Sequence, residues 1–134
     1  MPVGVLVAWT FFVWIGRIRN AFSDATLSTG EQRGALALAL SFVVPAVVIG
    51  GALVLAGRSG GSRGAASVVR FGVWALGLWS IGVWLVKAID IAFLSERDGA
   101  FIVVHTVLAV VSIVVSVVAI RAVERRSAAS NGPA

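Results

Sequence analysis

The stretch WTFFVWIGRIRN at residues 9–20 is followed later in the chain by WSIGVWLVKAID at residues 79–90. Aligned without a gap, three of the twelve positions are identical, two of them tryptophan, and four more keep their chemical type. The four similar pairs are Thr10/Ser80, Ile15/Leu85, Arg17/Lys87 and Asn20/Asp90. A second long apolar run follows each copy, so the chain is predicted to be a tandem of two helical hairpins.

The composition indicates that the surrounding solvent is lipid. The chain has 134 residues, of which 59% are hydrophobic and 13% charged, and its mean hydropathy is +1.01. A helix needs about 20 apolar residues to cross a hydrocarbon core of about 30 Å. Residues 34–57 form such a run without any charge, and residues 99–120 form another, in which His105 is the one ionisable side chain.

Two further runs, residues 1–16 and 71–86, are too short to cross before their first cation. Sixteen residues extend roughly 24 Å as a helix, so both helices must continue past Arg17 and Lys87, whose long stems let the charged groups reach water. Four helices are therefore predicted, near residues 3–22, 33–57, 68–94 and 100–123. Ser28 or Thr29, followed by Glu31, is a candidate capping box for the second helix.

The predicted fold class is an all-α membrane protein, a bundle of four transmembrane helices made of two tandem, parallel-repeat hairpins. Each hairpin has an even number of spans, so both copies would point the same way, related by a pseudo-two-fold axis along the membrane normal. We expect a single domain over 1–134, with repeat units at about 1–57 and 68–123. The basic linker 57–67 joins them, and the tail 127–134 is expected to be disordered.

The positions of the basic residues predict the orientation. The net charge is +5, but the cations lie almost entirely in loops and the tail, which is the pattern of membrane topology and not of nucleic-acid binding. The linker and tail carry six basic residues against five at the other ends of the helices. Both termini are therefore expected to be cytoplasmic. Ten arginines against one lysine, with an excess of alanine, valine and glycine, agree with a bacterial source, so the expected location is a bacterial plasma (inner) membrane.

The spacing of the repeated motif predicts which side chains point inward. Trp9, Val13, Arg17 and Asn20 fall within about 80° of one another on a helix, and their counterparts in the second copy do the same. Trp14 and Trp84 would then face lipid or another protein. Small and hydroxyl residues predict the inward faces of the other two helices: Gly34, Ala37, Ser41, Pro45 and Ala52 on one, and His105, Ala109, Ser112, Ser116 and Ala119 on the other.

This arrangement places a candidate polar layer near one interface, made of Arg17, Asn20, Lys87, Asp90 and His105. Ionisable residues at membrane depth are candidates for function. The layer could hold a lipid headgroup or anionic ligand, or it could be a cluster of ion pairs that sets the register of the helices. Asp90 could pair with Arg17 across the bundle, or with Lys87 one turn back on its own helix.

Several chemistries have no matching residues. The chain has no cysteine and one histidine, so a bis-histidine haem has no second ligand. Zinc and iron sites need three or four ligands, and the predicted membrane spans contain only His105 and Asp90 at the polar layer. No phosphate loop or nucleophile elbow appears. We therefore expect a protein that is not an enzyme, with no catalytic, metal or cofactor residues.

The sequence resembles small, uncharacterised four-helix integral membrane proteins of actinobacteria. The resemblance rests on four segments: Trp9-Thr10-x-x-Val13-Trp14, Arg17-Ile18-Arg19-Asn20, Leu27-Ser28-x-Gly30 and Val103-Val104-His105-Thr106-Val107-Leu108-Ala109. It implies no particular activity. Small multidrug resistance transporters are similar in size and span count, but they carry a glutamate in the first helix, where this chain has no acid.

Two functions remain after these exclusions. The first is an accessory or scaffolding subunit, whose partners would be the bilayer and either a larger membrane complex or further copies of the chain. The second is a small transporter, or a protein that binds lipid or an anionic ligand, using the polar layer.

Overall fold

The computed structural model describes residues 1–58, 63–93 and 99–130. These residues form four helices: α1 (Pro2–Ser23), α2 (Thr29–Arg58), α3 (Arg63–Phe93) and α4 (Gly99–Ser130). All four are long and apolar enough to cross a membrane. The prediction of an all-helical chain with four candidate membrane spans is confirmed.

Local sequence explains where α1 and α2 begin. Pro2 opens α1, where its missing N–H costs nothing. Before α2, the Ser28 backbone N–H donates to a Glu31 carboxylate oxygen at 2.8 Å, and the Glu31 N–H donates to Ser28 Oγ at 3.3 Å. This is the predicted capping box, with Ser28 as the cap. In the turn, Thr26 donates two hydrogen bonds to Asp24, which lower the pKa of that carboxyl group.

Three helix ends lie well outside the predicted bounds. α2 begins at Thr29, four residues before the predicted start at 33. α3 begins at Arg63, inside the expected linker 57–67, and α4 continues to Ser130, so residues 127–130 of the tail are helical. The apolar runs set the predicted bounds, but alanine, arginine and glutamate beyond them are good helix formers and continue the hydrogen-bond ladder into water. Residues 131–134 lie outside the described part of the chain.

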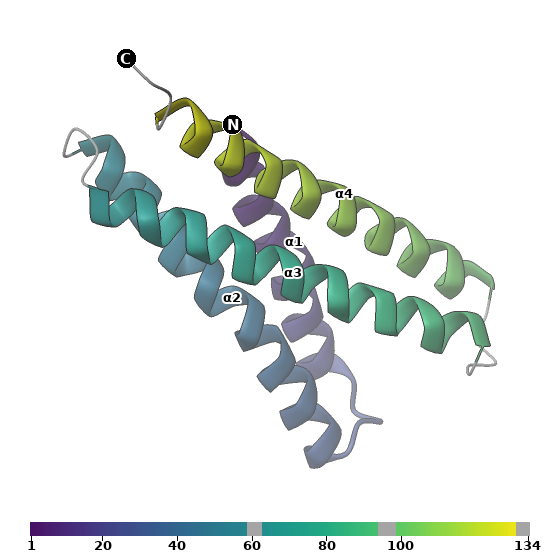
Figure 1. Cartoon of the computed structure of the whole chain (residues 1–134). Coiled ribbons are helices and arrows are strands. Elements are labelled where there is room, and N and C mark those ends of the chain that lie inside the picture. The colour runs from purple at the N-terminus through teal and green to yellow at the C-terminus, as the bar shows by residue number, and fades with distance from the viewer. Residues whose placement is uncertain (59–62, 94–98, 131–134) are drawn as a thin grey trace.

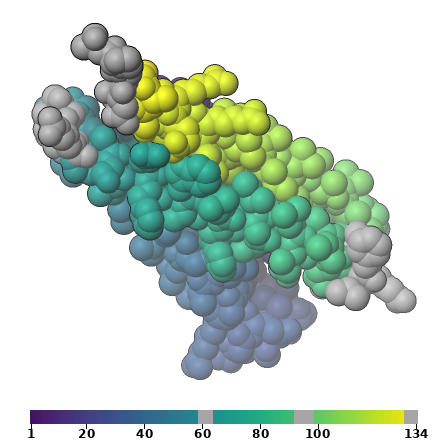
Figure 2. Space-filling view, viewed as in Figure 1, coloured from purple at the N-terminus to yellow at the C-terminus, as the bar shows by residue number. Residues whose placement is uncertain are grey.

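The helices pack in a ring, in which each one contacts its two neighbours in the order α1, α2, α3, α4 and back to α1. The start of α1, the end of α2, the start of α3 and the end of α4 lie together at one end of the molecule (Figure 1). From this end, which we call the termini end, the hairpins α1–α2 and α3–α4 diverge toward their turns. Figure 2 shows α3 lying along both α2 and α4.

Glycines allow α3 to approach both neighbours closely. A Cβ atom at Gly72 would lie 2.7 Å from Cγ1 of Ile49 on α2, and one at Gly77 would lie 2.8 Å from Cδ1 of Ile120 on α4. The two glycines are five residues apart, which places them about 140° apart around the helix. α3 therefore uses one glycine for each neighbour.

The buried faces differ in part from the prediction. On α4, the predicted residues Ala109, Ser112, Ser116 and Ala119 are buried. On α2, the predicted Gly34 and Ala37 are exposed, and the buried stripe is Ala39, Phe42, Ala46, Ile49 and Ala52. The prediction is therefore wrong for Gly34 and Ala37 and right for Ala52, and it missed Phe42 and Ile49, because a search for small residues does not select large buried side chains.

The prediction that Trp14 and Trp84 face outward, toward lipid or another protein, is wrong. Their side chains are only 6% and 3% exposed, whereas Trp79 is 48% exposed. Trp14 stacks on Phe42 of α2, with ring centroids 4.0 Å apart. In a ring of four helices, each helix packs against two neighbours, so a wide part of its circumference is buried. Two tryptophans five residues apart, about 140° around the helix, can therefore both contact a neighbour.

Candidate functional site

The structure brings together only some residues of the predicted polar layer. Arg17 of α1 and Lys87 of α3 line the same cavity, which the indole rings of Trp14 and Trp84 also line. Its volume is about 20 Å³, which is close to the space of a single water molecule. Two cations thus flank a space too small for a lipid headgroup.

Asp90 pairs with Lys87 on its own helix, one of the two predicted alternatives. The Lys87 Nζ to Asp90 Oδ2 distance is 3.8 Å, and both side chains are nearly half exposed. Such an exposed pair contributes at most about 1 kcal/mol. Within the described residues Arg17 has no ion pair with Asp90, so the pairing across the bundle does not form.

His105 and Asn20 lie apart from this group. His105 Nδ1 is 2.9 Å from the backbone oxygen of Phe101, and the two rings are stacked. His105 lines a different cavity, between α3 and α4, and Asn20 is exposed near the end of α1. The two hairpins diverge toward their turns (Figure 1). Residues near the turns of different hairpins are therefore far apart, even though the sequence predicts the same membrane depth for them.

Two matching hydrogen bonds cross the bundle between the hairpins. The indole N–H of Trp9 on α1 donates to Ser112 Oγ on α4 at 2.9 Å. The indole N–H of Trp79 on α3 donates to Ser41 Oγ on α2 at 3.0 Å. Trp9 and Trp79 are the first tryptophans of the two repeated stretches, so each copy bonds to the second helix of the other hairpin.

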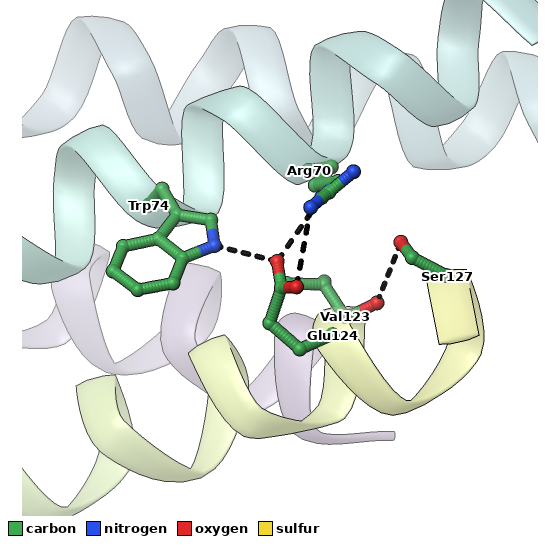
Figure 3. Close-up of polar contacts among 5 residues, drawn as sticks. All are labelled: Arg70, Trp74, Val123, Glu124 and Ser127. Carbon is green, nitrogen blue, oxygen red and sulfur yellow. Dashed lines mark hydrogen bonds and ion pairs between the residues drawn. The ribbon is translucent and has the colours of Figure 1, made fainter.

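A polar cluster at the termini end was not predicted. Glu124 of α4 accepts two hydrogen bonds from Arg70 of α3, at 3.0 and 3.1 Å, and a third at 2.7 Å from the indole N–H of Trp74 (Figure 3). Arg70 and Trp74 are one turn apart, so both reach the same carboxylate. The signal in the sequence was a lone acid, Glu124, among arginines at the end of an apolar helix.

Two further buried hydroxyls, those of Thr10 and Ser116, bond within their own helices. Thr10 donates to the Leu6 carbonyl and Ser116 to the Ser112 carbonyl. In the described part of the chain, no buried side-chain nitrogen or oxygen lacks a hydrogen-bond partner, and no three His, Asp or Glu residues are placed to share a metal ion. These polar groups bond either to another helix or to the preceding turn of their own helix. Within the described residues, no buried side-chain nitrogen or oxygen is left unbonded and available to a ligand.

Comparison of the chain with known protein families, with curated proteins and with solved structures finds no match.

Proposed function

We propose that this chain is a non-enzymatic, multi-pass protein of a bacterial plasma membrane, and that it acts as an accessory or scaffolding subunit of a membrane complex. The observation that carries the proposal is the packing between the hairpins. The cavity lined by Arg17 and Lys87 has a volume of only about 20 Å³, and the buried residues Trp14 and Trp84 line it too. A transport path would need a wider, polar passage at this point.

The outer surface supports the same role. Large apolar side chains on every helix are more than half exposed, among them Phe12, Val48, Phe71 and Val107. Surfaces of this kind contact lipid or another membrane protein. The proposed partner is therefore a transmembrane segment that packs against these helices, in a larger complex or in another copy of the chain.

A second candidate function is transport or binding of an anionic ligand or lipid. The nearness of two cations, Arg17 and Lys87, favours it, but the cavity between them would have to widen to admit the ligand. Asp90→Asn separates the two proposals because it removes the acid that offsets Lys87. For a scaffold, we expect the variant to co-purify with the same partners as the wild type from native membranes in mild detergent. For a carrier, the wild-type protein in liposomes should move or bind an anion, and Asp90→Asn should change that activity.

Two results together would overturn the scaffold proposal in favour of the carrier proposal. The wild-type chain would be recovered without a stoichiometric membrane partner or second copy, and it would carry anions across the membrane of liposomes. Glu31→Gln is a suitable control for general effects of losing an acid. Glu31 lies in the α1–α2 capping box, away from Lys87.

We also propose that the two hairpins are copies of one ancestral unit, related by a pseudo-two-fold axis along the membrane normal. The bonds Trp9–Ser112 and Trp79–Ser41 support this because a two-fold axis would exchange α1 with α3 and α4 with α2. Ser112→Ala and Ser41→Ala should each lower the free energy of unfolding by about 0.6 kcal/mol, the average for such bonds in membranes. Double-mutant cycles with Trp9→Phe and Trp79→Phe should give similar coupling energies, and a coupling at only one pair would count against the symmetry.

The proposed orientation puts both termini in the cytoplasm. The described arginines near the termini end support it, and they include Arg58, Arg70, Arg121, Arg125 and Arg126. The chain has no cysteine, so single substitutions give clean labelling sites. In intact spheroplasts a membrane-impermeant thiol reagent should label Ala25→Cys, in the α1–α2 turn, and spare Ala129→Cys. The opposite pattern would reverse the orientation.

A further inference from the structure

A larger cavity lies at the termini end, on the opposite side of the bundle from the predicted polar layer. All four helices contribute to it, and its volume is about 340 Å³, which is within the range of about 300–1,000 Å³ typical of ligand pockets. Val3, Leu53 and Val69 provide apolar walls, and Arg70, Arg126 and Ser127 provide polar groups. The cavity therefore combines an apolar interior with cations.

The two arginines differ in how they are engaged. Arg70 uses its Nε–H and one Nη2–H for Glu124, which leaves three of its five N–H donors without a bond to a described residue. Arg126 is exposed and makes no hydrogen bond or ion pair with any residue in the described ranges. Glu124 is already neutralised by Arg70, so the uncompensated positive charge at the cavity belongs to Arg126.

The chemistry of the cavity selects its occupant. Arginine binds phosphate oxygens through paired N–H donors, and basic pockets between transmembrane helices bind anionic lipid headgroups. A free phosphate would leave the apolar walls in contact with water, whereas a phospholipid would cover them with an acyl chain. We infer that the cavity binds one anionic phospholipid, with its phosphate at Arg126 and Arg70 and the upper part of an acyl chain against Val3, Leu53 and Val69.

This inference goes beyond the proposed scaffolding role and does not depend on it. It also gives a role to the part of α4 that continues past the apolar run. Glu124 belongs to that extension and positions Arg70, and Arg126 lies less than one turn further on. The lipid joins all four helices at the end where the two hairpins converge (Figure 1).

The test uses the full chain in mild neutral detergent after removal of bound lipid. Phosphatidylglycerol or phosphatidylcholine with identical acyl chains is added, and the lipid retained by each protein is counted by native mass spectrometry. We expect the wild type to retain one phosphatidylglycerol in preference to phosphatidylcholine. Arg126→Gln should weaken the binding about fivefold, the factor that corresponds to about 1 kcal/mol for one basic residue at a lipid surface.

Arg125→Gln is the matched control, because it removes the same charge from the adjacent position, which does not line the cavity. It should bind phosphatidylglycerol as the wild type does. Ala56→Phe, at a cavity-lining position, keeps every charge but fills the space, and it should also reduce retention. Circular dichroism of each variant should give the same helical signal as the wild type, which checks that the substitution has not disrupted the fold.

Three results would overturn the inference. Equal retention of the two lipids would mean that the headgroup charge is not recognised. Equal losses in Arg126→Gln and Arg125→Gln would mean that general surface charge attracts the lipid. Displacement of phosphatidylglycerol by millimolar sodium phosphate would mean that the site binds a free anion and not a lipid.

Discussion

Trp14→Ala should lower the free energy of unfolding by about 3 kcal/mol, the lower end of the range for a buried tryptophan. Trp14 is 6% exposed and stacks on Phe42, which is itself 1% exposed. In a bilayer the loss comes mainly from packing, because lipid tails are as apolar as the interior. The measurement is a titration from mild detergent into denaturing detergent, followed by helical circular dichroism.

Phe71→Ala is the control, because Phe71 is an aromatic residue that is 78% exposed. It should change the free energy of unfolding by less than about 0.5 kcal/mol, as surface substitutions generally do. The proposed repeat adds a second expectation, since Trp84 is the counterpart of Trp14 and is 3% exposed. Trp84→Ala should therefore cost a similar amount. A loss for Trp14→Ala no larger than that for Phe71→Ala would show that the stack of Trp14 on Phe42 does not stabilise the packing of α1 against α2.

Gly77→Leu should lower the free energy of unfolding by about 2–3 kcal/mol, which is the upper part of the range for overpacking. Even a Cβ atom at this position would lie 2.8 Å from Cδ1 of Ile120 and 3.7 Å from Cβ of Ser116. Leucine adds three further carbons beyond Cβ, so the Ile120 side chain must move aside and α3 and α4 must move apart to make room. The same detergent titration measures the effect.

Gly82→Leu gives a close comparison, because Gly82 lies on the same helix with no atom within 4 Å of its would-be Cβ. That substitution replaces glycine by a better helix former, so it should be neutral or slightly stabilising. If both leucine variants lose stability equally, close approach of α3 and α4 is not the cause. Gly72→Ala extends the test to α2, where the added Cβ would meet the fully buried Ile49.

Much of the helical architecture was predictable from hydropathy. The uncharged run 34–57 alone is long enough for a span, and the short runs 1–16 and 71–86 required extension past a cation. The structure has helices over all these residues. The capping box at Ser28 and the Lys87–Asp90 pair were also predictable, because each depends on residues three apart along one segment.

The candidate site was predicted less well. A shared depth in the membrane suggested that Arg17, Asn20, Lys87, Asp90 and His105 would meet, but depth does not specify the distance between hairpins. Arg17 and Lys87 line one cavity, whereas His105 bonds to the backbone of its own helix. The cluster of Arg70, Trp74 and Glu124 was missed because Glu124 lies on a different helix, 54 positions after Arg70.

The sequence by itself determined the number of helices and that each is long and apolar enough to cross a membrane. Hydropathy and helix rise are properties of each segment alone, and a polypeptide in lipid must satisfy its backbone hydrogen bonds within the segment. Only the tertiary structure decided that Trp14 and Trp84 are buried, that α3 contacts α2 and α4 through Gly72 and Gly77, and that the hairpins diverge. These features depend on how side chains of different helices fit together. Because lipid provides no hydrophobic force between helices, that fit, and not the apolar pattern, selects the inward faces.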